Sequence, residues 1–187
     1  MRLTKPRFAP LSDAEMNEEQ REALKDFGPG PLLNIFRTLV NAPKALTRFN
    51  TWGGYILSRR NDLPAREREI VILRTGYLCK SGYEWTQHVR IGLREGLTED
   101  EIARLKKGAD AGWGPADAAL IRASDELHAD QFVSDATWAE LSKHFTEKQC
   151  MDVVFTAGQY TQVSMFLNTF GVQLDEGLTL DPDLKGF

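Results

Sequence analysis

The chain has 187 residues, of which 42% are hydrophobic and 27% are charged, a composition typical of a globular protein with one hydrophobic core. Its 23 Lys and Arg residues are outnumbered by 27 Asp and Glu residues, giving a formal net charge of -4. Nucleic acid binding requires a concentrated field of basic residues, which this sequence lacks. We therefore expect one domain over residues 1–187, with no nucleic acid partner.

The sequence shows no sign of targeting to a membrane or for export. No apolar run follows the basic residues at the N-terminus, and nowhere do about 18 apolar residues follow one another without a charge. Cys79 and Cys150 lie far apart in the sequence, which favours two reduced thiols over a disulfide. We expect a soluble, cytoplasmic protein that does not associate with membranes.

Capping signals predict helices along the whole chain. Three Ser or Thr residues stand three positions before a Glu or Gln, which is the capping-box pattern: Ser12–Glu15, Thr98–Glu101 and Thr146–Gln149. Pro115 suits a first helical position and Ser134 suits an N-cap. Together with hydrophobic periodicity, these signals predict helices over 13–26, 32–40, 43–60, 64–79, 82–95, 99–108, 115–129, 135–144 and 147–170.

Several segments refine this picture. Residues 66–78 are apolar around most of the circumference, which predicts a helix buried in the core. Residues 151–174 contain β-branched and aromatic residues that would suit a strand, but their length without a proline favours a helix. Gly-Pro-Gly-Pro at 28–31 predicts a turn, and residues 175–187 predict an irregular tail. The expected fold class is all-α.

Two residue patterns indicate acid–base chemistry. Glu84 and His88 stand four apart on a predicted helix, so they share one face, where a carboxylate would raise the pKa of the imidazole and fix its tautomer. By spacing alone, the alternative is a surface ion pair. Glu69 lies on the predicted buried helix and needs a partner, or its pKa rises. The alternative there is a charge favoured by the helix dipole.

Residues 66–96, REREIVILRTGYLCKSGYEWTQHVRIGLREG, resemble the signature helix pair of the carboxymuconolactone decarboxylase family, which includes alkylhydroperoxidase D (AhpD). The resemblance implies an AhpD-like, all-helical homo-oligomer with its active site on these two helices. In the peroxidase branch, a glutamate on the first helix precedes a Cys-x-x-Cys pair, and a histidine follows four residues after the second cysteine. Aligning His88 with that histidine puts Ser81 and Glu84 at the cysteine positions and Glu69 at the proton-relay glutamate.

The lactone decarboxylase branch of this family has a glutamate four residues before the histidine, as Glu84 is here, but no acidic residue at the position of Glu69. The chain combines features of both branches and is most similar to members with a Tyr-Glu-Trp sequence and no Cys-x-x-Cys pair. Tyr83 and Trp85 could equally be core residues, since aromatic residues two apart on a helix are also typical of a core. The resemblance implies catalytic roles for Glu69, Glu84 and His88, and substrate contacts from Ser81, Tyr83 and Trp85.

Because neither aligned position is a cysteine, we expect proton transfer instead of dithiol chemistry. The predicted function is a cofactor-free lyase or decarboxylase that acts on a small carboxylate or lactone, similar to 4-carboxymuconolactone. One alternative is an alkylhydroperoxidase or peroxiredoxin-like enzyme that uses Cys79 with an external thiol, although Cys79 stands two residues too early, about 200° around the helix. Another is a non-catalytic helical binding or assembly protein.

Other candidate sites are weaker. Asp125 and His128, three apart on a predicted helix, favour a structural hydrogen bond. Three histidines without an HxxxH or HExxH motif do not indicate a metal site, and no glycine-rich loop follows a strand, so we expect no metal and no cofactor. Large aromatic residues are assigned to the core or to subunit contacts: Trp52, Trp113, Trp138, Phe166 and Phe170.

Overall fold

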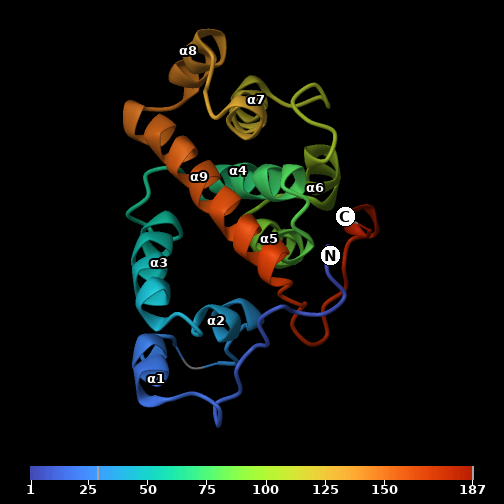
Figure 1. Ribbon diagram of the computed structural model, residues 1–187. Helices are drawn as coiled ribbons and strands as arrows, with labels where there is room; N and C mark the ends of the chain where they lie inside the picture. The colour runs from blue at the N-terminus through green and yellow to red at the C-terminus, as the bar shows by residue number, and fades with distance from the viewer. Residues whose placement is uncertain (29, 187) are drawn as a thin grey trace.

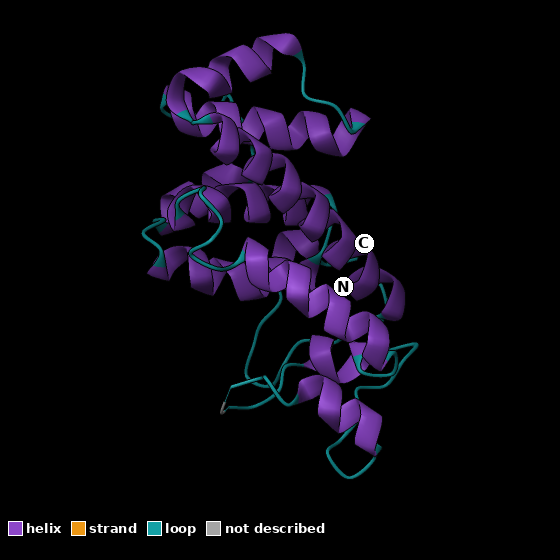
Figure 2. Cartoon of the chain, turned by 90° about the vertical axis from the view of Figure 1, so that its left-hand side faces the viewer, coloured by secondary structure: helices purple, strands orange, loops and turns teal. Residues whose placement is uncertain are grey.

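The computed structural model describes residues 1–28 and 30–186, and its regular structure in these ranges is entirely helical (Figures 1 and 2). The predicted all-α class is therefore confirmed. Pro29 in the predicted turn and Phe187 at the end of the predicted tail lie outside the described residues. The helices are α1 (Glu18–Leu24), α2 (Asn34–Leu39), α3 (Pro43–Ile56), α4 (Ala65–Leu78), α5 (Gly82–Arg94), α6 (Glu99–Leu105), α7 (Pro115–Asp130), α8 (Asp135–His144), α9 (Glu147–Phe170) and the 3-10 helix η1 (Pro182–Leu184).

Local capping sets most helix starts as predicted. The Thr98 and Thr146 capping boxes begin α6 and α9, the Ser134 side chain caps α8, and Pro115 opens α7. Helix α9 continues without a break to Phe170, so the segment that would also have suited a strand is a helix. Its length exceeds what a strand of this composition would reach, and it packs against several other helices.

The first helix starts later than predicted. Glu15 Oε2 does accept from the Ser12 backbone N–H at 2.8 Å, which is one of the two bonds of a capping box, but the chain forms only a turn there. A second capping box, in which Asn17 accepts from the Gln20 backbone and Gln20 accepts from that of Asn17, begins the helix instead. The predicted helix over 13–26 is therefore shortened to Glu18–Leu24.

Helix α3 ends four residues before its predicted limit at residue 60. After Ile56 the side chains take over the local hydrogen bonding: Ser58 accepts from the Arg60 backbone N–H at 3.1 Å, and Asn61 accepts from that of Leu63 at 3.0 Å. Such side-chain to backbone bonds offer the chain a turn in place of a further helical turn.

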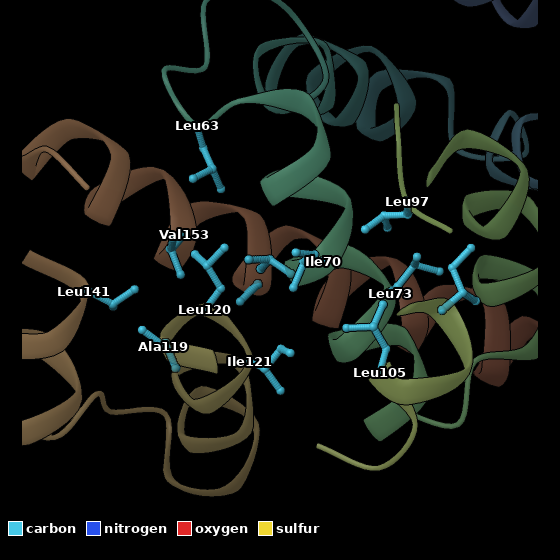
Figure 3. Close-up of a cluster of buried hydrophobic side chains, with 14 of the residues drawn as sticks. Leu63, Ile70, Leu73, Leu97, Leu105, Ala119, Leu120, Ile121, Leu141 and Val153 are labelled. Carbon is cyan, nitrogen blue, oxygen red and sulfur yellow. The ribbon is translucent and has the colours of Figure 1, made fainter. Parts of the chain in front are cut away.

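Helix α4 lies at the centre of the fold, in contact with α5, α6, α7 and α9 (Figure 1). Ile70, Val71, Ile72 and Leu73 are each 0% exposed, which confirms the prediction of a buried helix. Figure 3 shows this core, in which α4 residues meet side chains from other helices, among them Leu120, Ile121, Leu141 and Val153. Because α4 is covered on several sides, the polar Glu69 is carried into the interior with it.

The two ends of the described chain meet. The amino group of Met1 donates to the Leu184 carbonyl at 2.9 Å, and Lys106 on the loop after α6 pairs with Asp181 at 2.7 Å. The tail therefore packs on its own chain. Cys79 and Cys150 are both free thiols, as predicted.

None of the helices in the described ranges is long and apolar enough to cross a membrane. Assembly into a homo-oligomer and a cytoplasmic location stay predictions from the sequence.

Candidate active site

The centre of the candidate site is a buried pair between α4 and α5. His88 Nδ1 lies 2.8 Å from Glu69 Oε2, and these residues are 7% and 1% exposed. The partner of His88 is therefore Glu69 across the helix interface, and not Glu84, which the spacing on α5 predicted. Because Nδ1 is engaged by Glu69, Nε2 is the ring nitrogen that is left to meet a ligand.

Glu84 is held separately in the same interior. It is 2% exposed, and its Oε2 accepts a 2.6 Å hydrogen bond from Ser164 Oγ on α9. Its Oε1 has no hydrogen-bond partner among the described residues. Burial raises the pKa of the Glu84 carboxyl well above its usual range, and the charge of Glu69 raises it further, against the opposing effect of the Ser164 hydrogen bond. The protonated, neutral form of Glu84 is thereby favoured.

Gly76 on α4 makes room for the Glu84 side chain. A Cβ atom at this position would overlap Glu84 Oε1, which is buried between helices and has little space to withdraw. The close approach of α4 to the Glu84 carboxyl therefore depends on the absence of a side chain at residue 76.

Gly76→Ala should lower the free energy of unfolding by up to about 2 kcal/mol, because an overpacking cost of about 1–3 kcal/mol outweighs the roughly 1 kcal/mol that alanine gains over glycine in a helix. Gly158→Ala is the matched control: Gly158 lies on an exposed part of α9, with nothing near its missing Cβ, so that variant should be slightly stabilised. Denaturant unfolding measures both. Equal stabilisation of the two variants would contradict the packing described for Glu84.

His88 and Glu84 both line a cavity of about 670 Å³. Residues of α2, α3, α5 and α9, with the end of α1 and the segment after it, form its wall, which is mainly apolar. The Tyr160 ring meets the His88 ring edge to face, with centroids 4.8 Å apart and planes at 87°. Glu69 is not part of the wall, and its hydrogen-bonded contact with a wall residue is the one to His88.

Tyr83 lines the same cavity, but its hydroxyl is used to hold the tail. The Tyr83 hydroxyl donates to Asp175 Oδ2 at 2.5 Å, and Asp175 Oδ2 also accepts from Gln87 Nε2 at 2.7 Å. Burial raises the pKa of Tyr83, and the hydrogen bond to Asp175 raises it further, which keeps the phenol protonated. The structure therefore gives the Tyr83 ring a place in the wall and its hydroxyl a structural bond.

The structure does not bring Trp85 and Ser81, the other two predicted substrate contacts, to this cavity. Trp85 is 2% exposed, packs its ring near Tyr77 and donates from Nε1 to Asp181 at 3.0 Å. Adjacent residues on a helix point about 100° apart, so Trp85 leaves the face that Glu84 occupies. Ser81 is 0% exposed at the start of α5, and its hydroxyl has no partner among the described residues.

Helix α9 supplies site residues that the sequence analysis missed. Gln159 and Tyr160 line the cavity, and Ser164 binds Glu84. Tyr160 and Ser164 are four residues apart, so they share one face of α9. The sequence could have indicated these residues as polar groups on the buried face of a long apolar helix. It could not indicate their partners, because these lie on helices distant in the sequence.

Cys79 lies at the C-terminal end of α4, where its Sγ is 3.6 Å from His128 Nδ1 on α7. The predicted bond between Asp125 and His128 is not made, because Asp125 instead accepts from Arg74 Nε at 2.5 Å. Burial raises the pKa of the Cys79 thiol, and the nearby Glu84 adds to this, while the Ser164 and Thr161 hydroxyls oppose it. The reactive thiolate is therefore disfavoured.

The fold is that of AhpD-like helical proteins. A protein from Ralstonia eutropha JMP134, described as an AhpD core and peroxidase-related, superposes with a TM-score of 0.79 at 18% identity, over 91% of this chain and 93% of its own. A putative antioxidant defence protein AhpD from Agrobacterium tumefaciens gives 0.68 at 17%, over 73% and 94%. The debrominase Bmp8, in complex with 2,3,4-tribromopyrrole, gives 0.72 at 12%, over 92% and 94%.

The sequence was also compared with family models. Residues 43–126, from α3 into α7, match the model of the carboxymuconolactone decarboxylase family. The resemblance predicted from residues 66–96 is thereby confirmed, and the AhpD-like fold with it. No curated protein matches the chain.

Proposed function

We propose that the protein is a cofactor-free enzyme of the lyase or decarboxylase type, acting by acid–base chemistry on a small carboxylate or lactone similar to 4-carboxymuconolactone. The observation that carries this proposal is the buried His88–Glu69 pair beside the buried Glu84, with His88 and Glu84 both in the wall of one cavity. The family match over residues 43–126 supports an enzymatic role.

His88 is the residue that moves the proton in this proposal. Its Nε2 takes a proton from the carbon next to a substrate carbonyl, or returns one to that carbon. Glu69, bonded to Nδ1, is a positioning residue: it fixes the ring orientation and stabilises the imidazolium that forms when Nε2 is protonated. Its burial keeps water from competing for that bond.

Glu84 acts as the neutral acid. In its protonated form it donates to the substrate carbonyl oxygen, so the electrons displaced at the neighbouring carbon are held as an enol or enolate. With a β-carboxylate, the carbon–carbon bond breaks, carbon dioxide leaves, and His88 protonates the carbon. With a lactone, the proton that His88 removes is returned at another carbon, or water opens the ring.

A panel of 4-carboxymuconolactone, simple γ-lactones and β-keto acids tests this proposal. Ring opening or isomerisation is followed by proton NMR and carbon dioxide release by a coupled assay. We expect at least one compound to turn over with wild-type protein and turnover to fall in Glu69→Gln. If none turns over, while Glu69→Gln changes only the stability of the fold or of an assembly, the non-catalytic binding function is the better one.

A second candidate is a peroxidase that uses Cys79 with an external thiol. The contact between Cys79 Sγ and His128 Nδ1 favours it, since an imidazole can accept the thiol proton. Two of the similar solved structures are described as peroxidase-related. The raised pKa of Cys79 weighs against it.

Cys79→Ser separates the two candidates. If the acid–base proposal is correct, this variant should keep its lactone turnover and show no loss of peroxide consumption beyond that of Cys150→Ser, whose sulfur is buried elsewhere in the core. Loss of dithiothreitol-dependent peroxide reduction in Cys79→Ser alone would favour the peroxidase.

A further inference from the structure

The cavity wall offers no basic side chain for an anion. Among the described residues that line it, the acidic groups are Asp26 and Glu84, the only imidazole is that of His88, and no Lys or Arg is present. The nearby Arg68 guanidinium donates to the backbone carbonyls of Ser58 and Leu63, at 3.4 Å each, and is not part of the wall.

The charged groups behind the cavity wall do not supply the missing positive charge. His88 is bonded to Glu69, so even a protonated imidazole is matched by a carboxylate at 2.8 Å. Asp26 stands exposed beside the cavity, where it would repel an entering anion. A carboxylate moved from water into this mainly apolar space would lose its hydration and gain no free cation.

The polar groups in the wall suit an uncharged ligand instead. Gln159 is 4% exposed, lines the cavity and has an Oε1 atom with no hydrogen-bond partner among the described residues. This buried oxygen is an acceptor, so a neutral hydroxyl or amide N–H on a ligand would satisfy it. The apolar wall residues, such as Ile35, Phe49 and Val163, would cover the rest of such a molecule.

We infer that the cavity takes an uncharged, mainly apolar carbonyl compound that also carries a hydroxyl or amide N–H, such as a hydroxylated lactone or cyclic ketone, and selects against carboxylate anions. Gln159 is assigned as the side chain whose Oε1 accepts from that hydroxyl or N–H. The inference rests on the acid–base chemistry of the proposed function and narrows its substrates to neutral lactones and ketones. It therefore favours isomerisation or ring opening over the release of carbon dioxide from a carboxylate.

Binding of an isosteric pair of probes tests this inference on the wild-type protein. 3-Phenylpropanamide and 3-phenylpropanoate have nearly the same shape and differ in charge, and dihydrocoumarin adds a neutral lactone. We expect calorimetry near neutral pH to show binding of the amide and of dihydrocoumarin, with the carboxylate weaker by about tenfold or more. Equal or tighter binding of the carboxylate, or binding of none of the three at millimolar concentration, would overturn the inference.

A variant that adds a positive charge at the rim of the cavity tests whether the lack of a cation disfavours carboxylates. Leu57 lines the cavity and is 49% exposed, so Leu57→Arg adds a guanidinium beside the cavity without burying it. We expect this variant to bind 3-phenylpropanoate more tightly than wild type does. Leu93→Arg is the matched control, because Leu93 is 39% exposed on α5 and does not line the cavity. The same gain in both variants would mean that general surface charge, and not the cavity, sets the preference.

These binding results and the proposed function fail in different ways. If the carboxylate binds as well as the amide while lactone turnover still requires His88, only the charge preference is wrong. If the neutral probes bind selectively but no lactone or ketone is ever converted, the inferred ligand class stands and the proposed acid–base function fails.

Discussion

His88→Gln is expected to lower kcat for the converted lactone or keto acid by about 10²–10⁴-fold, the range typical of losing a general acid–base group. Glutamine can still bond Glu69 from a similar position, but it cannot take up and release a proton near neutral pH. The change should therefore appear in kcat much more than in KM. Steady-state kinetics on the purified variant measures it.

The control for this variant is His144→Gln. His144 lies at the end of α8, where its Nε2 is 3.3 Å from Glu140 on an exposed surface, far from the cavity wall. Its kcat should stay within about twofold of wild type, as expected for a surface substitution. Equal losses in the two variants, or full activity of His88→Gln, would remove His88 from the proposed mechanism.

Glu84→Gln is expected to stabilise the fold increasingly as the pH rises, while it abolishes turnover. The pKa of Glu84 is raised in the folded state, so its protonated form supports folding fully below the unfolded pKa of about 4.3. That contribution is lost as the pH rises toward the folded pKa, at up to about 1.4 kcal/mol per pH unit. Glutamine stays neutral, and its carbonyl can still accept from Ser164.

Denaturant unfolding from about pH 5 to about pH 9 measures this effect as the difference in the free energy of unfolding between Glu84→Gln and wild type. The difference should grow with pH. Glu140→Gln is the control: Glu140 is on the exposed face of α8, its pKa is lowered by Lys143 and His144, and its difference from wild type should be flat over this range. A flat profile for Glu84→Gln as well would mean that Glu84 is ionised at little cost in the folded state.

The fold was predictable because its signals are local. The Thr98 and Thr146 capping boxes, Pro115 and the long apolar segment of α9 each define a helix through residues close in sequence. The error at the first helix is also local, since two capping boxes compete within a few residues and Asn17 begins the helix instead of Ser12.

The candidate site was predictable only in part, because its contacts join distant residues. The spacing on α5 predicted that Glu84 would pair with His88. Helix packing instead brings Glu69 to the His88 ring, and Glu84 bonds Ser164. No residue near position 84 in the sequence indicates that a serine of α9 will meet it.

Of the predicted ligand contacts, Tyr83 lines the cavity, whereas Trp85 and Ser81 do not, for a related reason. Tyr83 is in the cavity wall, while its neighbour but one, Trp85, faces the C-terminal tail and bonds Asp181. The sequence defines the direction of each side chain around α5, but which direction meets the cavity depends on where α9, α3 and the tail pack. Gln159 was missed because a glutamine in a long apolar helix has no distinctive pattern.

The central claim is that protons, not electrons, move at His88 and Glu84. Its most direct test is proton NMR of dihydrocoumarin in heavy water with the purified protein, following deuterium uptake at the carbon next to the carbonyl. We predict protein-dependent uptake that is lost in His88→Gln and unchanged in Cys79→Ser. Uptake no faster than without protein, or uptake that persists in His88→Gln, would contradict this account.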